Sequence, residues 1–252
     1  DAILIQAPEG QTALIDAGPG VPLVPMLQAH GVEALDLVVA SHPHADHIGG
    51  MGQVLQSIPV RYYMDNGVPH TTATYLAVMQ ELRKHPGITY LEASPRTLGL
   101  GSVSLRILPL PPRPTSNHNN HSVGLVLKHG SFLGFFSGDS ERWELARFLQ
   151  DGAVPDVSLL KAPHHGSDDG FTEDFLQAAS PEVVVICVGP NSFGHPRAQA
   201  LRAYERYADQ VLRTDRDGTV TIAGYEDGSH EVVPGIWNKS KDAATPSNGK
   251  GG

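Results

Sequence analysis

The feature that most constrains this chain is an apolar segment, residues 35–40, that runs directly into a histidine-rich loop. The segment is short, and its composition is typical of a buried strand. The loop reads Ser-His-Pro-His-Ala-Asp-His at residues 41–47, so three imidazoles and one carboxylate lie within six residues. These polar groups cannot all point into an apolar core. The sequence therefore predicts a sheet whose edge carries a cluster of polar side chains.

The loop has the ligand types of a metal site. His42 and His44 are two residues apart, so in an extended chain their side chains project the same way and can hold one ion. Asp46 and His47 lie in the turn beyond and can reach a second ion. Imidazole nitrogen and carboxylate oxygen suit zinc and its neighbours. The alternative is a solvated loop with Asp46 as a helix N-cap, which explains the carboxylate but not the three histidines.

Two later strand ends carry further candidate ligands, because one loop cannot enclose two ions. Asp139 follows the apolar segment 132–137, where we expect a bridging ligand; the alternative is an N-cap for a helix at residues 141–150. His164 and His165 follow the segment 157–161 in the same topological position. We expect at least one of the two to be a ligand.

Composition narrows the class of protein. The 252 residues suit one large domain or two small ones, and with 40% hydrophobic and 18% charged residues the chain is expected to form an ordinary core. No run approaches the roughly 20 apolar residues of a membrane span. The 18 Lys and Arg against 27 Asp and Glu give a formal charge of −9, which argues against a basic surface for duplex DNA. Bound metal could supply positive charge locally.

The chain has a single cysteine, Cys187, so an internal disulfide is excluded. Cys187 lies in an apolar run and is expected in the core.

The order of the predicted elements favours an α/β sandwich. Each half of the chain shows hairpins followed by alternating helices and strands, which suits two sheets with helices outside. Residues 109–120 form a Pro- and Asn-rich loop, and residues 234–252 a flexible polar tail or linker after a domain at 1–233. We expect strands at residues 2–6, 12–16, 35–40, 60–64, 89–91, 103–108, 123–128, 132–137, 157–161, 183–188, 211–213 and 220–225, and helices at 21–30, 48–57, 72–84, 141–150, 172–179 and 198–207.

Taken together, these motifs resemble the metallo-β-lactamase superfamily. The pattern His-x-His-x-Asp-His at residues 42–47, the Gly-Asp pair at 138–139 and the His-Gly pair at 165–166 carry the resemblance, and Leu-Ile-Asp-Ala-Gly at 14–18 is similar to the first acidic motif of that family. The resemblance implies a four-layer αββα sandwich with a dinuclear metal site, Zn or Mn, along one edge. It also implies that His165, rather than His164, is the ligand.

A closer resemblance is to the hydrolase domain of ComEC-type DNA-uptake (competence) proteins and their free-standing exported relatives. Short matches lie at residues 1–5, 119–122, 160–161, 164–167, 194–196 and 213–218. This resemblance implies a nuclease or phosphodiesterase acting on single-stranded DNA or a small phosphodiester. It implies a location outside the cytoplasm, either exported or at the outer face of a membrane. The sequence opens within a strand pattern and without Met, so we expect upstream residues, which could include a membrane domain.

The first metal site departs from the usual superfamily pattern. The expected histidine motif before the Gly-Asp pair is missing, and His121 is its nearest equivalent, with His118 as the competitor. The ligand set implied by the resemblance is therefore His42, His44 and His121 for the first ion, Asp46, His47 and His165 for the second, and Asp139 between them.

Three residues are candidates for roles in the reaction itself. Asp46 could orient the attacking water while it binds the second ion. His195, in a Gly-His-Pro turn, could contact a phosphate or protonate the leaving group, or be a plain turn residue. Lys161 could offset the charge of a scissile phosphate, or be a surface lysine.

The same site could serve other functions. It could hydrolyse a lactam, lactone or thioester, since fold does not fix substrate. It could also belong to a module that binds partners without catalysis, which the intact ligand set disfavours.

Overall fold

The computed structural model describes residues 1–20, 22–112 and 117–233. A five-stranded sheet has the order β1 (Ile3–Gln6), β2 (Thr12–Ile15), β3 (Leu35–Val39), β4 (Val60–Asp65) and β5 (Thr89–Glu92). Strands β1 and β2 form the predicted antiparallel hairpin, and β2 to β5 run parallel. The carboxyl ends of β2, β3 and β4 therefore meet at one edge of the sheet.

The second sheet has seven strands. Their order is β12 (Gln210–Arg213), β11 (Val183–Ile186), β10 (Leu159–Lys161), β9 (Phe132–Phe136), β8 (Leu125–His129), β7 (Val103–Ile107) and β6 (Arg96–Leu100). Strands β9 to β12 are parallel, whereas β6 to β9 are antiparallel. A small hairpin of β13 (Thr221–Gly224) and β14 (His230–Val233) forms a separate two-stranded sheet, and its Ile222 packs against the core between the two large sheets.

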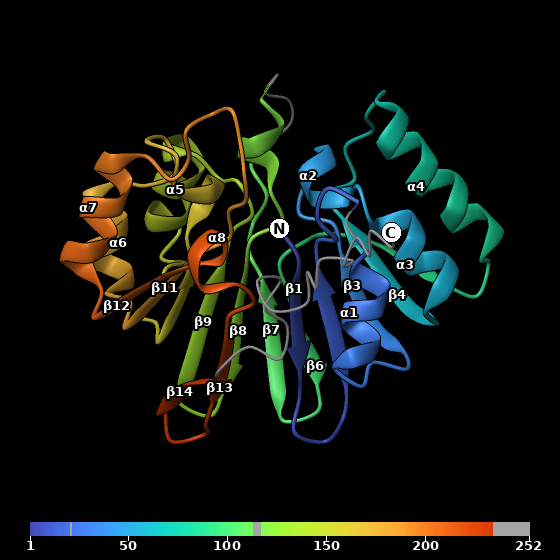
Figure 1. Cartoon of the computed structure of the whole chain (residues 1–252), viewed down its shortest axis with the longest axis horizontal. Coiled ribbons are helices and arrows are strands. Elements are labelled where there is room, and N and C mark those ends of the chain that lie inside the picture. Colours follow the sequence, from blue (N-terminus) through green and yellow to red (C-terminus); the bar gives the residue numbers. More distant parts are fainter. Residues whose placement is uncertain (21, 113–116, 234–252) are drawn as a thin grey trace, which may run out of the picture.

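The two sheets face each other and helices cover their outer sides, which confirms the predicted αββα sandwich (Figure 1). Helices α1 (Leu23–Ala29), α3 (Met51–Ser57) and α4 (Ala73–Lys84) pack on the first sheet. Helices α5 (Arg142–Gln150), α6 (Glu173–Ala179) and α7 (Ala198–Tyr207) pack on the second. The sandwich therefore has three apolar layers, one between the sheets and one under each group of helices.

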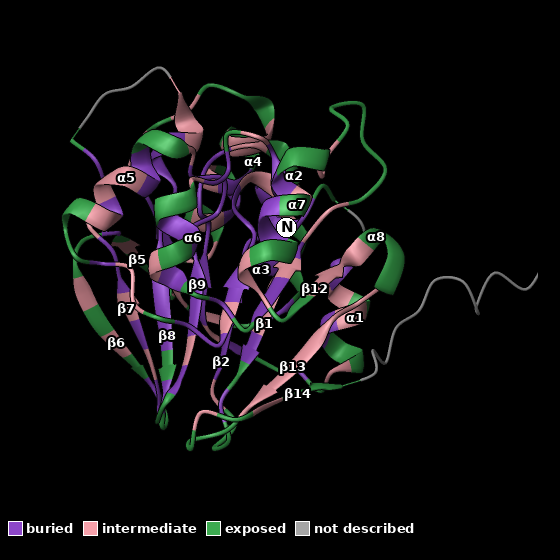
Figure 2. Ribbon diagram, turned by 90° about the vertical axis from the view of Figure 1, so that its left-hand side faces the viewer, coloured by how far each residue is buried: buried purple, intermediate pink, exposed green. Residues whose placement is uncertain are grey.

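Alternation along the strands builds these layers. Ala13 and Ile15 point between the sheets, whereas Leu14 packs under the helices of the first sheet. In the second sheet Phe136 points between the sheets and Phe135 packs under the helices. Successive side chains of a strand face opposite sides, so a strand buried on both faces is apolar throughout. Figure 2 accordingly shows the central strands buried and the outer faces of the helices exposed.

Several local predictions were wrong. The helix expected at 48–57 is divided into α2 (Ala45–Ile48) and α3, and a Cβ on Gly50 would lie 2.3 Å from the carbonyl oxygen of Ala17. This close approach requires glycine at the junction. Strands β6 and β14 were not predicted, and a helical turn, α8 (Thr214–Asp217), follows β12. Cys187 follows the end of β11 and is partly exposed rather than in the core.

Two further expectations concern the C-terminal tail and membrane-spanning segments. The predicted tail at 234–252 lies outside the described residues. Within the described part of the chain, no helix has the length and apolar character to cross a membrane.

Candidate metal centre

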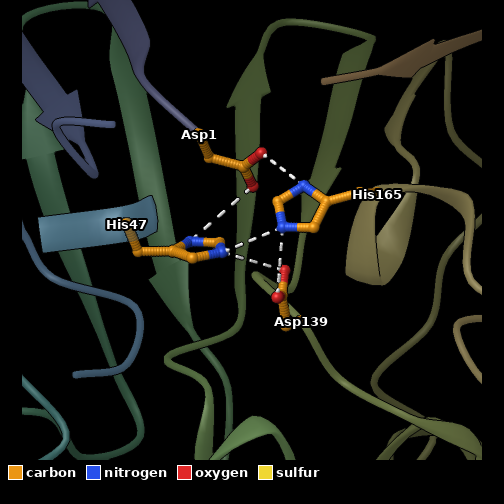
Figure 3. A group of neighbouring side chains, drawn as sticks. All are labelled: Asp1, His47, Asp139 and His165. Atoms are coloured by element: carbon orange, nitrogen blue, oxygen red, sulfur yellow. Dashed lines mark hydrogen bonds and ion pairs between the residues drawn. The ribbon is translucent and has the colours of Figure 1, made fainter. Parts of the chain in front are cut away.

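Four side chains from distant parts of the sequence meet where strands of the two sheets end. His47 lies in α2 after β3, Asp139 in the turn after β9, His165 after β10, and Asp1 just before β1. Each offers one ligand atom, and these atoms lie within 4.8 Å of one another (Figure 3). The carboxyl ends of β3, β9 and β10 therefore converge on one site, as predicted for the edge of the sandwich.

A buried carboxylate fixes the ring of His47. Nδ1 of His47 lies 2.7 Å from Oδ2 of Asp16. The same carboxylate accepts hydrogen bonds from Ser41, through Oδ1 from the backbone N–H and through Oδ2 from the hydroxyl. The carboxylate accepts the Nδ1 hydrogen, so Nε2 of His47 is left with a lone pair. This Nε2 lies 3.1 Å from Oδ1 of Asp139.

The ring of His165 is held in a similar way. Its Nδ1 lies 2.9 Å from the carbonyl oxygen of Cys187, which can only accept a hydrogen bond. Its Nε2 lies 3.3 Å from Oδ2 of Asp46 and 3.3 Å from Oδ2 of Asp139. Burial disfavours the charged ring, yet the two carboxylates raise the pKa of His165 to about 9. The environment of Nε2 is therefore strongly negative and favours a cation.

The backbone at His164 and His165 is unusual. Their φ angles are 47° and 52°, in the left-handed region that residues other than glycine rarely adopt. This conformation points the rings of the two neighbours in different directions: His165 faces the cluster, while Nε2 of His164 is 4.0 Å from Oδ2 of Asp139. Strained backbone of this kind is concentrated at functional sites.

His42 and His44 lie together, as their spacing predicts. Nε2 of His42 is 3.0 Å from Nδ1 of His44 and 3.8 Å from Oδ2 of Asp139. Burial holds the pKa of His42 well below its usual range, so the ring is neutral and able to donate a lone pair. The structure thus places His42, with His44 in contact with it, beside the carboxylate of Asp139, where we predict the first ion.

The donor set fits a divalent cation. Nε2 of His47 and Nε2 of His165 are 3.3 Å apart, and both face the carboxylate of Asp139. Oδ1 of Asp139 has no hydrogen-bond partner, and the carboxylates of Asp139 and Asp46 both face Nε2 of His165. This concentration of negative charge requires a cation: the raised pKa of His165 indicates that a proton meets this need without metal, and a divalent ion would displace that proton. Ligating histidines commonly bond oxygen acceptors through their other nitrogen, as both rings do here.

The third ligand of the first ion stays a prediction. His121 is buried and its carbonyl oxygen accepts a hydrogen bond from Asn66. The ring centroid of His118, the competitor, lies 6.2 Å from that of His44. Part of the preceding loop, residues 113–116, lies outside the described residues.

The two other catalytic candidates differ in their surroundings. His195 lies in the loop after β11, with its ring centroid 5.6 Å from that of His164, and burial lowers the pKa of His195. Lys161 is 2% exposed, so the surface alternative was wrong: it is the last residue of β10, and its ammonium lies beside the carboxylates of Asp1 and Asp139. Its ammonium donates to the carbonyl oxygen of Gly138 at 2.8 Å.

Sequence reasoning missed two acidic residues of the site. Asp1 was expected only as part of the family match at residues 1–5, because a carboxylate at the start of a strand gives no sign of its burial. Glu141 accepts hydrogen bonds from the amides of Asn117, Asn119 and Asn120, and so fixes the segment that contains His118 and His121. The cluster of asparagines before Ser122 was the sequence feature that could have indicated an acceptor such as Glu141.

The sequence of this chain is similar to those of known proteins. The family model described as the metallo-beta-lactamase superfamily matches residues 1–189. The chain is 29% identical to ComE operon protein 3 of Bacillus subtilis over 202 residues, covering 79% of this chain and 26% of the relative. It is 26% identical to competence protein ComA of Neisseria gonorrhoeae over 200 residues, covering 79% and 26%. The chain thus spans about a quarter of the length of these curated relatives.

Solved structures confirm the fold. The structure of Igni18, a metallo hydrolase from Ignicoccus hospitalis, aligns with a TM-score of 0.57 at 17% identity, covering 92% of this chain and 94% of that one. CmlA β-hydroxylase aligns with a TM-score of 0.56 at 16% identity, covering 84% and 50%.

Proposed function

Since this chain belongs to the metallo-β-lactamase superfamily, we propose that it is a metal-dependent hydrolase that cleaves phosphodiester bonds, with single-stranded DNA as substrate. The superfamily places it among metallo-hydrolases, and relatives named for competence and for recombination direct the choice of substrate. A location outside the cytoplasm belongs to the same proposal.

The observation that carries the proposal is the arrangement around Asp139. The Nε2 atoms of His42, His47 and His165 all face this buried carboxylate, at 3.8, 3.1 and 3.3 Å. His42, His44 and His121 would hold one divalent ion, Asp46, His47 and His165 the other, and Asp139 would contact both. When bound, Zn or Mn would lower the pKa of water and withdraw charge from the phosphoryl oxygens.

The protein's own groups have distinct tasks in this proposal. The carboxylate of Asp46 is 53% exposed, so it can accept a hydrogen bond from the attacking water while its other oxygen stays beside His165. The His195 ring is partly exposed at the rim of the site, where its N–H can donate a hydrogen bond to the leaving-group oxygen or to a phosphate oxygen.

The experiment compares substrates on the metal-supplemented protein. We expect hydrolysis of bis-p-nitrophenyl phosphate and of a single-stranded oligonucleotide, both abolished by EDTA and restored by Zn or Mn. Nitrocefin, a lactam, should be turned over at least about 100-fold more slowly, a difference of roughly 3 kcal/mol in transition-state stabilisation. Turnover of nitrocefin without turnover of either phosphodiester would contradict the proposal and favour a small-molecule hydrolase, which the relatives do not support.

A further inference from the structure

Phe193, in the loop after β11, is the most exposed large apolar side chain among the described residues. It is 68% exposed, whereas the other exposed side chains of this kind are between 37% and 48% exposed. A single exposed apolar side chain is common in folded proteins, so exposure alone assigns no role. Phe193 differs from the others because the same loop carries His195, at the rim of the site.

The loop that carries Phe193 is closed and anchored by hydrogen bonds. The side-chain amide of Asn191 donates to the carbonyl oxygen of His195 at 3.0 Å and accepts a hydrogen bond from the N–H of His195 at 3.0 Å. After the loop, the N–H of Arg197 donates to the carbonyl oxygen of Gly166, in the turn that follows β10, at 2.8 Å. The exposed ring is therefore presented by a loop that is attached to the backbone of the metal site.

A row of three aromatic rings leads from Phe193 to the site. The rings of Phe193 and His195 have centroids 5.9 Å apart, and their planes are 14° from parallel. The centroid of the His164 ring lies 5.6 Å from that of His195, and Nε2 of His164 lies 4.0 Å from Oδ2 of Asp139. Phe193 is therefore the outermost of three rings that begin beside this carboxylate, within reach of a substrate bound there.

The charge of the chain limits how it can bind a nucleic acid. With a formal charge of −9, the chain has no excess of cations to neutralise a run of phosphates. Proteins that bind single strands also use aromatic side chains, on which bases stack without a need for positive charge or for a particular sequence. A cation does lie beside the loop, since a Cβ on Gly194 would be 3.2 Å from Nη1 of Arg197. A flat exposed ring with a guanidinium nearby suits a nucleobase and its phosphate.

We propose that Phe193 determines the preference of this site for single strands: its ring stacks on an unpaired nucleobase next to the phosphodiester that is cleaved. In a duplex each base is paired and covered by its neighbours, and exposing it costs free energy of unstacking. A single strand offers the face of a base without that cost. This inference rests on the proposed function for its substrate, but stacking is measured as binding, without turnover.

The first experiment compares KM for a short oligodeoxythymidylate on the Zn-supplemented protein. Phe193→Leu keeps an apolar side chain but removes the ring, and it should raise KM about tenfold or more. Phe193→Tyr keeps the ring and should restore most of this loss. The matched control is Tyr225→Leu, which removes an exposed ring between β13 and β14, at the end of β9 opposite to Asp139. It should have the KM of the unchanged protein.

The second experiment removes the base instead of the ring. A strand of abasic nucleotides offers sugars and phosphates only, so the unchanged protein should bind it about tenfold more weakly than the oligodeoxythymidylate. In Phe193→Leu the difference between the two strands should largely disappear, because ring and base belong to one interaction and their losses do not add. Equal weakening of both strands in Phe193→Leu, or the same KM in Phe193→Leu and Tyr225→Leu, would overturn the inference.

Equilibrium binding separates this inference from the proposed function. Fluorescence anisotropy of a labelled oligodeoxythymidylate should give a Kd that is about tenfold higher in Phe193→Leu, and a smaller preference over the duplex with oligodeoxyadenylate. If the unchanged protein hydrolyses no phosphodiester, the proposed function is refuted, while a Kd that depends on Phe193 still supports stacking. Hydrolysis with the same Kd in both proteins refutes stacking and leaves the proposed function intact. Failure of the unchanged protein to bind the strand also refutes stacking.

Discussion

Nδ1 of His47 lies 2.7 Å from Oδ2 of Asp16, on the opposite side of the ring from Asp139. Asp16 itself has a φ of 60°, a conformation that asparagine and aspartate tolerate better than most residues. It also binds the backbone and hydroxyl of Ser41, the first residue of the histidine loop. One buried carboxylate therefore sets both the direction of His47 and the start of the loop.

We expect Asp16→Asn to weaken metal binding by about 10- to 100-fold with the fold retained, because the amide offers one acceptor oxygen where the carboxylate offers two. Calorimetric titration with Zn measures the change. Asp36→Asn, at the other end of β3, where the carboxylate accepts a hydrogen bond from Thr12, is the control. Equal metal affinity in Asp16→Asn and the control would show that the Asp16 contact does not support the ligand.

Asp46→Ala and His165→Ala should each lower phosphodiester hydrolysis at least about 100-fold with little change in circular dichroism. Removing a ligand, or the group that orients water, takes several kcal/mol from transition-state stabilisation. The measurement is kcat at saturating metal. Rates near that of the unchanged protein, from correctly folded variants, would reject the roles given to these two residues.

His121→Asn should be milder than His44→Asn in both metal content and rate. A neutral amide oxygen is a poorer zinc ligand than imidazole, so the first ion should be weakened and excess metal should restore much of the activity. His118→Asn, made in parallel, decides between the two histidines of this segment. Equal losses in His121→Asn and His44→Asn, unrescued by metal, would identify His121 as a full ligand.

The fold was predictable where burial leaves a pattern in the sequence. The strands that contain Leu14, Val38 and Phe135 are apolar because both of their faces are covered. Strand β6 was missed because it lies at a sheet edge, is half exposed and carries Arg96 and Gly99. The division of the histidine-loop helix was missed as well, since it depends on the contact between Gly50 and Ala17, which are distant in sequence.

Within the site, the residue types and their strand-end positions were predictable, but the charges around them were not. Lys161 was considered as a substrate contact or a surface residue, because a lysine at a strand end is usually solvated. Its burial depends on the carboxylate of Asp1, which is 160 residues away in the sequence. Pairings of this kind arise from tertiary packing and leave no periodicity to detect.

A second buried carboxyl group, Glu144 in α5, lies under the turn that carries Asp139. The hydroxyl of Ser140 is 2.7 Å from the carbonyl oxygen of Ser137 and 2.6 Å from Oε2 of Glu144. A hydroxyl has one hydrogen and cannot donate to both oxygens. A protonated Glu144 resolves this, since its O–H can donate to the Ser140 hydroxyl, which then donates to Ser137.

This arrangement predicts how stability depends on pH. Burial raises the pKa of Glu144 well above its usual value of 4.5, despite the hydrogen bond with Ser140. Above about pH 4.5 the unfolded chain releases the proton of Glu144, whereas the folded protein retains it. The contribution of Glu144 to the free energy of unfolding is therefore complete below that pH and is lost as the pH rises to the pKa in the folded protein.

Glu144→Gln keeps an N–H donor and cannot ionise. We expect it to match the unchanged protein near pH 5 and to exceed it increasingly toward pH 8, by up to about 1.4 kcal/mol per pH unit. Urea unfolding at equal metal concentration measures this, with the exposed Glu205→Gln as the control. Parallel pH curves for Glu144→Gln and the unchanged protein would show that Glu144 is already ionised in the fold.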